Sequence, residues 1–367
     1  MSTFTLMAGG TGGHLFPAMA LAEELRRRGH EIDLMTDHRV TGYGGNFPAR
    51  HTHIVPSATP SVRNPIKLAA ATATLGWGTL VARSMLARAW PDAVIGFGGY
   101  PIFPSFLAAT MLRIPGILHE QNAVMGRANA ALARFARILA VSFEKTARTE
   151  PYAGKTVLTG NPVRDRVRAV SGTPYPIISD SDPFNLLVFG GSQGARAFAD
   201  IVPPAIAWLA PRLKARLRVT QQCRPEDLDR VAEAYRQAKI SCELKAFFDD
   251  LPERMAESHL VIARSGASTI AELGVIGRPA ILIPLPGSID ADQRNNALVF
   301  ERAGAGWIAE QATLSPQSLG TRMTSLLGDR DNLRQAAAAA RSLGRPDAVE
   351  RLADLAEELA AKGVRRK

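Results

Sequence analysis

The sequence predicts an α/β fold in which two Rossmann-like domains each contain a doubly wound parallel sheet. Strand-like apolar runs alternate with helix-like runs along the chain, which is typical of a parallel sheet with helices on both faces. The length of 367 residues exceeds the size at which a single core keeps growing. A glycine-rich turn follows the first strand of each half, so we expect the two domains to face a central cleft.

The opening unit, residues 4–32, reads FTLMAGGTGGHLFPAMALAEELRRRGHEI. It predicts a strand that ends near Ala8 and an amphipathic helix whose apolar residues recur from Leu15 to Leu25. Glycines allow a ligand to approach the backbone closely, and the N-terminus of the following helix attracts an anion. The turn therefore favours a phosphate-bearing ligand, with a glycine turn that binds nothing as the alternative.

This turn departs from the dinucleotide-binding fingerprint, because Leu15 occupies the position of the third glycine. An NAD-dependent oxidoreductase would also need an acidic residue that closes the second strand, and Asp37 after EIDLMT is the candidate. A dinucleotide-dependent enzyme is therefore a weaker alternative.

Further elements follow in the same alternating order. We expect a strand at 93–97, a helix near 103–112, a strand at 116–119, a helix near 128–135 and a strand at 138–141. The segment 151–181 is dense in Pro, Gly, Ser and charged residues, which is typical of a crossing between domains. We place the first domain at residues 1–163, the second at 164–341, and a helix within 342–367 that packs back on the first.

The second half begins by repeating the opening pattern as FNLLVFGGSQGARAFADIVPPAI. Phe184 corresponds to Phe4, and the pair Gly190-Gly191 corresponds to Gly9-Gly10. A later strand at 260–263 leads through a further short turn into a helix that starts near Thr269. We therefore expect each half to contain a glycine-rich turn that binds a phosphate group.

Glu272 in this last helix has two interpretations. It could complete a capping box as the third helical residue after Thr269. It could instead accept both hydroxyls of a ribose, as acidic residues do in nucleotide-binding folds. Spacing alone favours the capping box.

The charge balance indicates which kind of binding partner to expect, and the cysteines indicate the redox state of the compartment. The chain has 44 Lys and Arg against 34 Asp and Glu, and residues 1–163 carry 16 of the basic and 9 of the acidic side chains. Basic residues do not alternate with aromatic ones, so we expect no nucleic acid and favour an anionic membrane surface. The two cysteines, Cys223 and Cys242, lack a pairing motif, which indicates a reducing compartment.

The uncharged stretch 68–82 is the candidate for membrane contact. It is too short and too rich in Ala, Thr and Gly to span a bilayer. Arg63, Lys67, Arg83 and Arg88 surround it, so it could dip into a membrane interface. An ordinary core helix is an equal alternative.

Few side chains have the spacing of a catalytic or metal site. Asp290 and Asp292 could hold Mg²⁺ on a diphosphate, but solvated loop carboxylates are the favoured interpretation and we expect no metal. His14 follows the glycine turn and is favoured over His119 as a general base. The sequence has no HExxH motif and no P-loop with its lysine, which disfavours zinc hydrolases and kinases.

Seven motifs follow one another along the chain: GGTGGHLFPA at 9–18, GGYP at 98–101, HEQN at 119–122, GNPVR at 160–164, GGSQGAR at 190–196, FFDDL at 247–251 and RSGASTIAEL at 264–273. Together, and in this order, they resemble the MurG family of bacterial N-acetylglucosaminyltransferases. The resemblance covers nearly the whole chain, and it rests on several motifs rather than one.

The resemblance implies a GT-B fold and an inverting transfer without metal or cofactor. The implied donor is UDP-GlcNAc and the implied acceptor is undecaprenyl-diphospho-MurNAc-pentapeptide, so that lipid I becomes lipid II in peptidoglycan synthesis. It also implies a peripheral protein on the cytoplasmic face of the bacterial inner membrane, with other cell-wall synthesis proteins as candidate partners. A GT-B transferase for another lipid or a small acceptor is the alternative.

The resemblance also assigns roles to individual residues. Thr11, Gly12 and Gly13 match the turn that faces the substrates. His14, Asn122 and Gln293 match residues near the donor sugar and the reacting hydroxyl, with His14 as the expected base. The other implied donor contacts are Arg164 and Ser192 at the diphosphate, the backbone of Phe248 at the uracil, Glu272 at the ribose, and the helix start Ala267, Ser268 and Thr269 at the leaving diphosphate.

Overall fold

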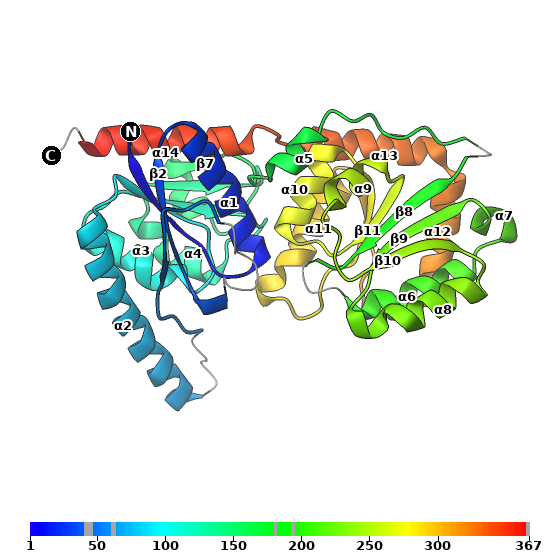
Figure 1. Cartoon of the computed structure of the whole chain (residues 1–367), viewed down its shortest axis with the longest axis horizontal. Coiled ribbons are helices and arrows are strands. Elements are labelled where there is room, and N and C mark those ends of the chain that lie inside the picture. Colours follow the sequence, from blue (N-terminus) through cyan, green and yellow to red (C-terminus); the bar gives the residue numbers. More distant parts are fainter. Residues whose placement is uncertain (40–46, 60–63, 180–181, 192–194, 365–367) are drawn as a thin grey trace. The chain divides into compact units, whose positions relative to one another are not determined.

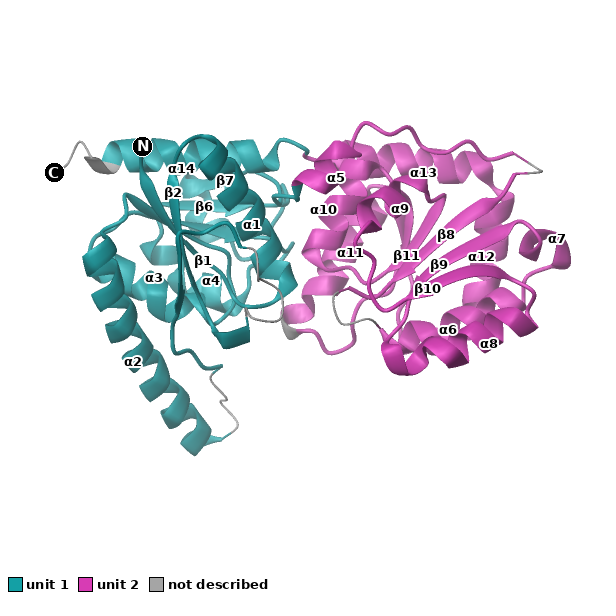
Figure 2. Cartoon of the chain, viewed as in Figure 1, with its two compact units in different colours: residues 1–164, 346–367 teal, residues 165–345 magenta. Residues whose placement is uncertain are grey.

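The computed structural model describes residues 1–39, 47–59, 64–179, 182–191 and 195–364. The chain divides into two compact units, residues 1–164 with 346–367 (unit 1) and residues 165–345 (unit 2), as Figure 2 shows. Each unit has its own parallel sheet with helices packed against it (Figure 1).

Within the described residues, unit 1 has a seven-stranded parallel sheet in the order β3-β2-β1-β4-β5-β6-β7. Its strands are β1 (Thr3–Met7), β2 (Glu31–Thr36), β3 (His51–Ile54), β4 (Ala93–Gly96), β5 (Gly116–Glu120), β6 (Ile138–Val141) and β7 (Thr156–Leu158). Its α-helices are α1 (Gly12–Arg27), α2 (Pro65–Ala89), α3 (Ile102–Met111), α4 (Arg127–Leu132) and α14 (Ala348–Val364).

The two faces of this sheet are buried against different helices, because side chains alternate along each strand. Phe4 and Leu6 of β1 belong to a core cluster with α1 and α14. Met7 of the same strand belongs to a second cluster with α2, α3 and α4. Helices therefore cover both faces, which confirms the predicted doubly wound arrangement.

Unit 2 repeats the plan with a six-stranded parallel sheet, counted over the part of the chain that is described, in the order β10-β9-β8-β11-β12-β13. Its strands are β8 (Phe184–Phe189), β9 (Leu217–Gln222), β10 (Ser241–Lys245), β11 (Leu260–Ala263), β12 (Ala280–Leu282) and β13 (Gly306–Ile308). Its α-helices are α5 (Asp165–Ala169), α6 (Arg196–Ala207), α7 (Pro211–Lys214), α8 (Leu228–Gln237), α9 (Leu251–Glu257), α10 (Ala267–Ile276), α11 (Asp292–Arg302), α12 (Pro316–Gly328) and α13 (Arg330–Leu343).

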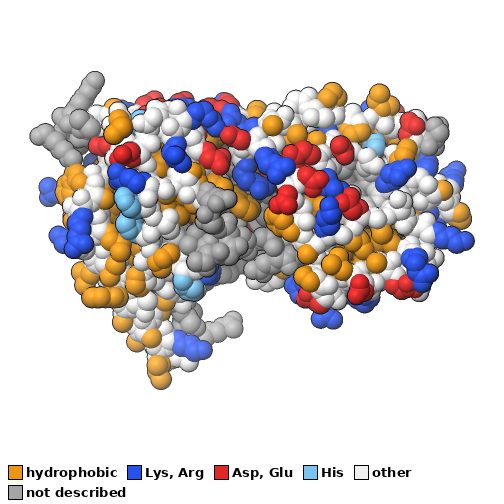
Figure 3. Space-filling view, in the orientation of Figure 1, with side chains coloured by type: hydrophobic (Ala, Val, Ile, Leu, Met, Phe, Trp, Pro, Cys, Tyr) orange, Lys and Arg blue, Asp and Glu red, His pale blue; other side chains and the backbone are white. Residues whose placement is uncertain are grey.

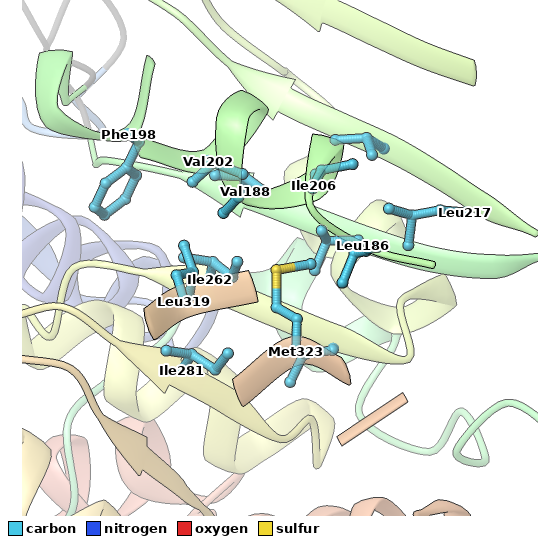
Figure 4. Packing of buried hydrophobic residues seen from close by; sticks show 14 of the residues in the cluster. Leu186, Val188, Phe198, Val202, Ile206, Leu217, Ile262, Ile281, Leu319 and Met323 are labelled. Carbon is cyan, nitrogen blue, oxygen red and sulfur yellow. The ribbon is translucent and has the colours of Figure 1, made fainter. Parts of the chain in front are cut away.

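The core of unit 2 joins its first strand to α6 and α12. Figure 4 shows Leu186 and Val188 of β8 together with Phe198 of α6 and Met323 of α12. All four side chains are almost fully buried. This packing fixes β8 at the centre of the sheet, and β8 is the strand that leads into the second glycine turn.

The prediction that 151–181 is only a crossing is wrong in part. Thr156–Leu158 forms β7 and pairs with β6 at the edge of the unit 1 sheet. A run of three residues is too short to show strand periodicity, and Gly154 and Lys155 before it resemble a loop.

The C-terminal helix α14 packs on α1 within unit 1. Leu352 and Ala356 enter the same core cluster as Leu25. At the end of α1, the Arg28 guanidinium donates to Asp354 at 2.6 Å and to Glu357 at 2.7 Å. Apolar burial and ion pairs thus hold α14 on this face of the sheet.

Helix α2 is buried on one side only. Gly78, Ala82 and Leu86 face the unit, and a Cβ on Gly78 would lie 2.0 Å from the carbonyl oxygen of Pro56, so only glycine permits this approach. Trp77 and Leu80 are 62% and 58% exposed. The core-helix interpretation therefore holds for one side of the helix, and Figure 3 shows hydrophobic side chains gathered along it. Among the described residues, no helix is both long enough and apolar enough to cross a membrane.

Candidate active site

In unit 1, the candidate site residues gather at the carboxyl ends of β1, β4 and β5. The strand β1 lies between β2 and β4, so the chain leaves it toward one side of the sheet and returns on the other. Ligands of doubly wound folds bind at this kind of switch point. GGTGGH and GGYP follow β1 and β4, and HEQN spans the end of β5, which is why residues far apart in sequence meet here.

The glycine turn after β1 leads directly into α1. Helix α1 begins at Gly12, and Thr11 is its extended N-cap, with no side-chain cap bond within the described residues. Gly13 is exposed, and a Cβ placed on it would meet nothing within 4 Å in the part of the chain that is described. The turn therefore presents backbone amides at a helix N-terminus on an open surface, which suits an anion.

His14 packs against the GGYP turn. Gly98 and Gly99 have φ of 86° and 80°, a backbone region that favours glycine. A Cβ on Gly98 would lie 3.4 Å from His14 Cε1, and one on Gly99 would lie 3.3 Å from His14 Nε2. The two glycines thus allow the imidazole to lie against the backbone after β4.

A hydrogen-bonded chain links His14 to the end of β5. His14 Nδ1 is 3.3 Å from Gln121 Oε1, and Gln121 Nε2 is 3.0 Å from His119 Nδ1. His119 Nε2 is 3.0 Å from the carbonyl oxygen of Gly160. Complete burial lowers the pKa of His119 to about 4, so this side chain is neutral near pH 7.

Glu120 shapes the loop that carries Asn122. Its buried carboxylate accepts from the backbone N–H of Asn122 at 3.0 Å and of Gly126 at 3.0 Å, and from Asn129 Nδ2 at 2.8 Å. Burial raises the pKa of Glu120, although these hydrogen bonds oppose the rise. The side-chain amide of Asn122 also donates to this carboxylate at 3.2 Å, which orients the predicted substrate contact.

Arg164 lies at the end of unit 1. Its guanidinium sits 4.6 Å from the ring centroid of Phe16 in α1, a cation–π geometry. The GNPVR motif, which ends at Arg164, therefore contacts α1, the helix that begins at the first glycine turn.

In unit 2, the N-terminus of α10 forms the centre of the predicted donor site. The helix begins at Ala267, and its N-cap is Gly266. Ala267, Ser268 and Thr269 thus make up its first turn, where the backbone amides have no partner within the helix and can bind an anion. The Ser268 hydroxyl oxygen is buried and has no hydrogen-bond partner among the described residues.

The capping-box interpretation of Glu272 is wrong. Because the N-cap is Gly266, Glu272 is the sixth helical residue and lies beyond the position that a capping box uses. Its side chain is buried. Helix capping therefore does not explain why the carboxylate of Glu272 is buried here.

Gln293 and Arg264 hold the loops around this helix start. Gln293 Oε1 accepts from the backbone N–H of Leu285 at 3.0 Å, and its carbonyl accepts from Ser265 Oγ at 2.8 Å. Arg264 donates to the carbonyls of Ile283 and Pro284 at 3.0 and 3.2 Å. The exits of β11 and β12 are thereby fixed to one another.

Phe248 follows β10 at the same edge of the sheet. Its ring is buried, with Arg254 at 4.7 Å and Lys245 at 5.5 Å from the centroid. Arg254 is itself held by two hydrogen bonds to Glu243, at 2.6 and 2.9 Å. The Phe248 ring is therefore held between two cations at the carboxyl end of β10.

Three other predicted positions are Ser192, Asp290 and Asp292. Ser192 lies outside the described residues. Asp292 Oδ1 accepts from the backbone N–H of Gln293 at 2.7 Å, and Asp290 has a left-handed φ of 60°. Within the described ranges, His, Cys, Asp and Glu side chains form no group of three or more that could hold a metal ion.

Comparison with known protein families decides the class. Residues 4–141 match the glycosyltransferase family 28 N-terminal domain, and residues 185–357 match the glycosyltransferase family 28 C-terminal domain. The chain belongs to glycosyltransferase family 28. It is therefore a glycosyltransferase, and the alternative of a dinucleotide-dependent oxidoreductase is wrong. In agreement, Leu15 is fully buried and Asp37 accepts from the Arg39 guanidinium at 2.9 Å.

Relatives of this family-28 enzyme are similar over nearly their whole length. The UDP-N-acetylglucosamine--N-acetylmuramyl-(pentapeptide) pyrophosphoryl-undecaprenol N-acetylglucosamine transferase of Methylobacterium sp. (strain 4-46) is 54% identical, over 97% of this chain and 96% of the relative. The protein of the same name from Methylobacterium nodulans is 52% identical, over 98% of both chains.

Solved structures agree with the predicted GT-B fold. The crystal structure of Acinetobacter baumannii MurG matches with a TM-score of 0.79 and 29% identity, over 98% of this chain and 100% of that one. A UDP-GlcNAc 2-epimerase from Neisseria meningitidis matches with a TM-score of 0.68 at 14% identity, over 98% of this chain and 100% of that one, and shares the fold alone.

Sequence reasoning missed several residues that support these sites. Glu120, Gln121 and Asn129 make the hydrogen bonds that organise the HEQN loop, and Arg264 does so in unit 2. One signal was available for two of them: Glu120 and Gln121 stand at the carboxyl end of a strand, where parallel sheets place ligand-binding groups.

Proposed function

We propose that this chain transfers N-acetylglucosamine from UDP-GlcNAc to the C4 hydroxyl of undecaprenyl-diphospho-MurNAc-pentapeptide, converting lipid I to lipid II. The observation that carries the proposal is the pair of relatives at 54% and 52% identity, whose names state this donor sugar and this acceptor. Their similarity extends over at least 96% of each chain, so it includes both sheets.

The proposed donor site lies in unit 2. The N-terminus of α10 binds the diphosphate, and its first-turn amides with the Ser268 hydroxyl supply donors for an anion. Glu272 accepts the ribose hydroxyls, and the backbone of Phe248 binds the uracil. Gln293 contacts the sugar, and the backbone N–H of Leu285 holds its side chain in position. Ser192, and Arg164 at the end of unit 1, are the other proposed contacts to the diphosphate.

The proposed acceptor site lies in unit 1. Thr11, Gly12 and Gly13 receive the acceptor diphosphate at the N-terminus of α1, where the dipole favours a negative group. Asn122, held by Glu120, contacts the reacting sugars. His14 is the general base.

The proposed step is a single displacement. The acceptor hydroxyl loses its proton to His14, its oxygen forms a bond to C1 of GlcNAc, and the bond from C1 to the phosphate oxygen breaks. The electron pair of that bond leaves with UDP, and the configuration at C1 inverts. Positioning of both substrates removes entropy from the barrier, while α10 and Arg164 stabilise the charge on the departing diphosphate.

Helix α2 is the proposed contact with an anionic membrane surface on the cytoplasmic face of the inner membrane. Ile66, Trp77 and Leu80 are exposed apolar side chains on it, and Lys67 and Arg83 are exposed cations on the same helix. Apolar burial in the headgroup region and attraction to anionic lipids would act together. This surface would bring unit 1 to its lipid-linked acceptor.

Transfer of labelled GlcNAc tests the proposed reaction. Purified protein is incubated with UDP-GlcNAc labelled in the sugar, a lipid I analogue and EDTA. Label in the lipid product supports both the acceptor and a metal-independent reaction. Transfer only after Mg²⁺ is added contradicts the metal-free reaction, and transfer only to a different lipid or small acceptor supports the alternative GT-B activity.

A further inference from the structure

The chain of side chains from His14 to His119 ends at a backbone carbonyl that fixes its proton positions. The carbonyl of Gly160 can only accept, so His119 Nε2, 3.0 Å away, carries a proton. His119 is fully buried and neutral near pH 7, so its Nδ1 has a lone pair. His119 Nδ1 is therefore a hydrogen-bond acceptor toward Gln121.

The amide of Gln121 can point only one way. Its Nε2 lies 3.0 Å from His119 Nδ1 and 3.2 Å from the carbonyl oxygen of His119. Both of these atoms accept, so the NH₂ group must face them. Gln121 Oε1 therefore faces His14.

This orientation determines the protonation of His14. Gln121 Oε1 is 3.3 Å from His14 Nδ1, and an amide oxygen only accepts. Nδ1 must then bear the proton, and in a neutral imidazole Nε2 bears the lone pair. We propose that Gln121 is a positioning residue that holds His14 as the Nδ1–H tautomer and so makes Nε2 the atom that accepts the proton of the sugar hydroxyl. The catalytic part of this inference rests on the proposed function.

Gly99 of the GGYP turn leaves room beside the Nε2 side of the ring. A Cβ on Gly99 would stand 3.3 Å from Nε2 and 3.2 Å from Cδ2. Either distance is tighter than ordinary van der Waals contact, so a larger residue would crowd the nitrogen that reacts. The Nδ1–H tautomer and the space beside Gly99 thus both favour Nε2 of His14 as the nitrogen that accepts the proton.

The reaction keeps the hydrogen bond to Gln121 throughout. The hydroxyl proton moves to Nε2, the new imidazolium retains Nδ1–H toward Gln121 Oε1, and the electron pair of the broken C1–O bond leaves with UDP. The proton on Nε2 then passes to solvent. A neutral amide adds no charge beside His14, so Gln121 acts through tautomer and orientation, as the buried partner of a catalytic histidine does elsewhere.

Nitrogen NMR of the full chain labelled with ¹⁵N-histidine tests the tautomer directly. Long-range ¹H–¹⁵N spectra near pH 7 distinguish a protonated ring nitrogen from one with a lone pair, and the His14→Gln variant identifies the His14 signals. We expect a protonated Nδ1 and a lone pair on Nε2. A protonated Nε2 with an unprotonated Nδ1 in the unchanged chain overturns the proposal.

Two variants test whether Gln121 is responsible. Gln121→Met keeps the length and removes both polar groups, and Gln121→Asn keeps a buried amide but withdraws its oxygen by one methylene. We expect both to shift His14 away from the Nδ1–H tautomer and to lower kcat about tenfold or more, with donor affinity unchanged. An unchanged tautomer in both variants contradicts the role of Gln121.

A matched control makes the same change at another buried glutamine. Gln221 in β9 is fully buried and accepts from the Tyr235 hydroxyl at 2.6 Å. Gln221→Met should leave the His14 tautomer and kcat unchanged. The His14→Ala variant separates the two claims: normal turnover would remove His14 as the base and so overturn that part of the proposed function, whereas the tautomer assignment would still be judged by the spectra.

Discussion

His30 Nε2 lies 2.7 Å from Glu357 Oε1, which joins the turn before β2 to a helix 327 residues later in the chain. The same carboxylate accepts from Arg28 at 2.7 Å. Burial raises the pKa of Glu357, but the hydrogen bonds from His30 and Arg28 and the charge of Arg28 outweigh burial and lower it. His30 and Glu357 are therefore part of a hydrogen-bonded cluster with Arg28 that holds α14 on α1.

We predict that Arg28→Ala lowers the free energy of unfolding of unit 1 by about 1–2 kcal/mol, because it removes hydrogen bonds to three carboxylates. Arg26→Ala, an exposed basic residue on the same helix, is the control and should cost less than about 0.5 kcal/mol. Hydrogen exchange of α1 and α14 measures both. Equal effects of the two variants would show that the cluster contributes nothing.

Buried His119 predicts a pH dependence of stability. Its pKa is about 4 in the folded chain and about 6.5 when unfolded, so between these values the unfolded state binds more protons. Its contribution is complete above pH 6.5 and is lost as pH falls toward 4, by up to about 3 kcal/mol. Denaturant unfolding across this range measures the slope. His119→Gln should flatten it, and an identical slope in that variant would contradict the assignment.

More of the fold than of the candidate site could be predicted from the sequence. The strands at 93–97, 116–119, 138–141 and 260–263 were visible because buried parallel strands are short apolar runs. The strand β7 was not visible, since three residues carry no periodicity. The glycine turn and His14 could be singled out from spacing, whereas the contact of His14 with Gln121 depends on how two loops meet at neighbouring strand ends. Local pattern gave no information on that contact.

We predict that Glu272→Gln weakens UDP-GlcNAc binding about 10- to 100-fold, since a charged acceptor of hydroxyl groups is replaced by a neutral one. Its melting temperature should change little by comparison, because Glu272 does not cap α10. Glu24→Gln is the control: Glu24 is also 7% exposed, but it belongs to unit 1. Calorimetric titration measures both affinities, and intact binding in Glu272→Gln would remove Glu272 from the donor site.

We predict that the exposed apolar side of α2 binds anionic vesicles. The double change Trp77→Ser and Leu80→Ser should reduce sedimentation with phosphatidylglycerol vesicles about tenfold or more, because both side chains would lose their apolar contact. Trp208→Ser is the matched control, since Trp208 in unit 2 is 64% exposed and Trp77 is 62% exposed. Equal binding by the unchanged chain and the double variant at low salt would exclude α2 as the membrane contact.

The bond formed between the two sugars is the most direct test of the proposed transfer to lipid I. The lipid product is isolated after turnover with UDP-GlcNAc and a lipid I analogue, and NMR determines which hydroxyl of MurNAc is substituted and the configuration at C1 of GlcNAc. We expect a bond to the C4 oxygen with the configuration at C1 opposite to that in the donor. A retained configuration would contradict the single displacement with His14 as base, and substitution at another hydroxyl would contradict the proposed acceptor chemistry.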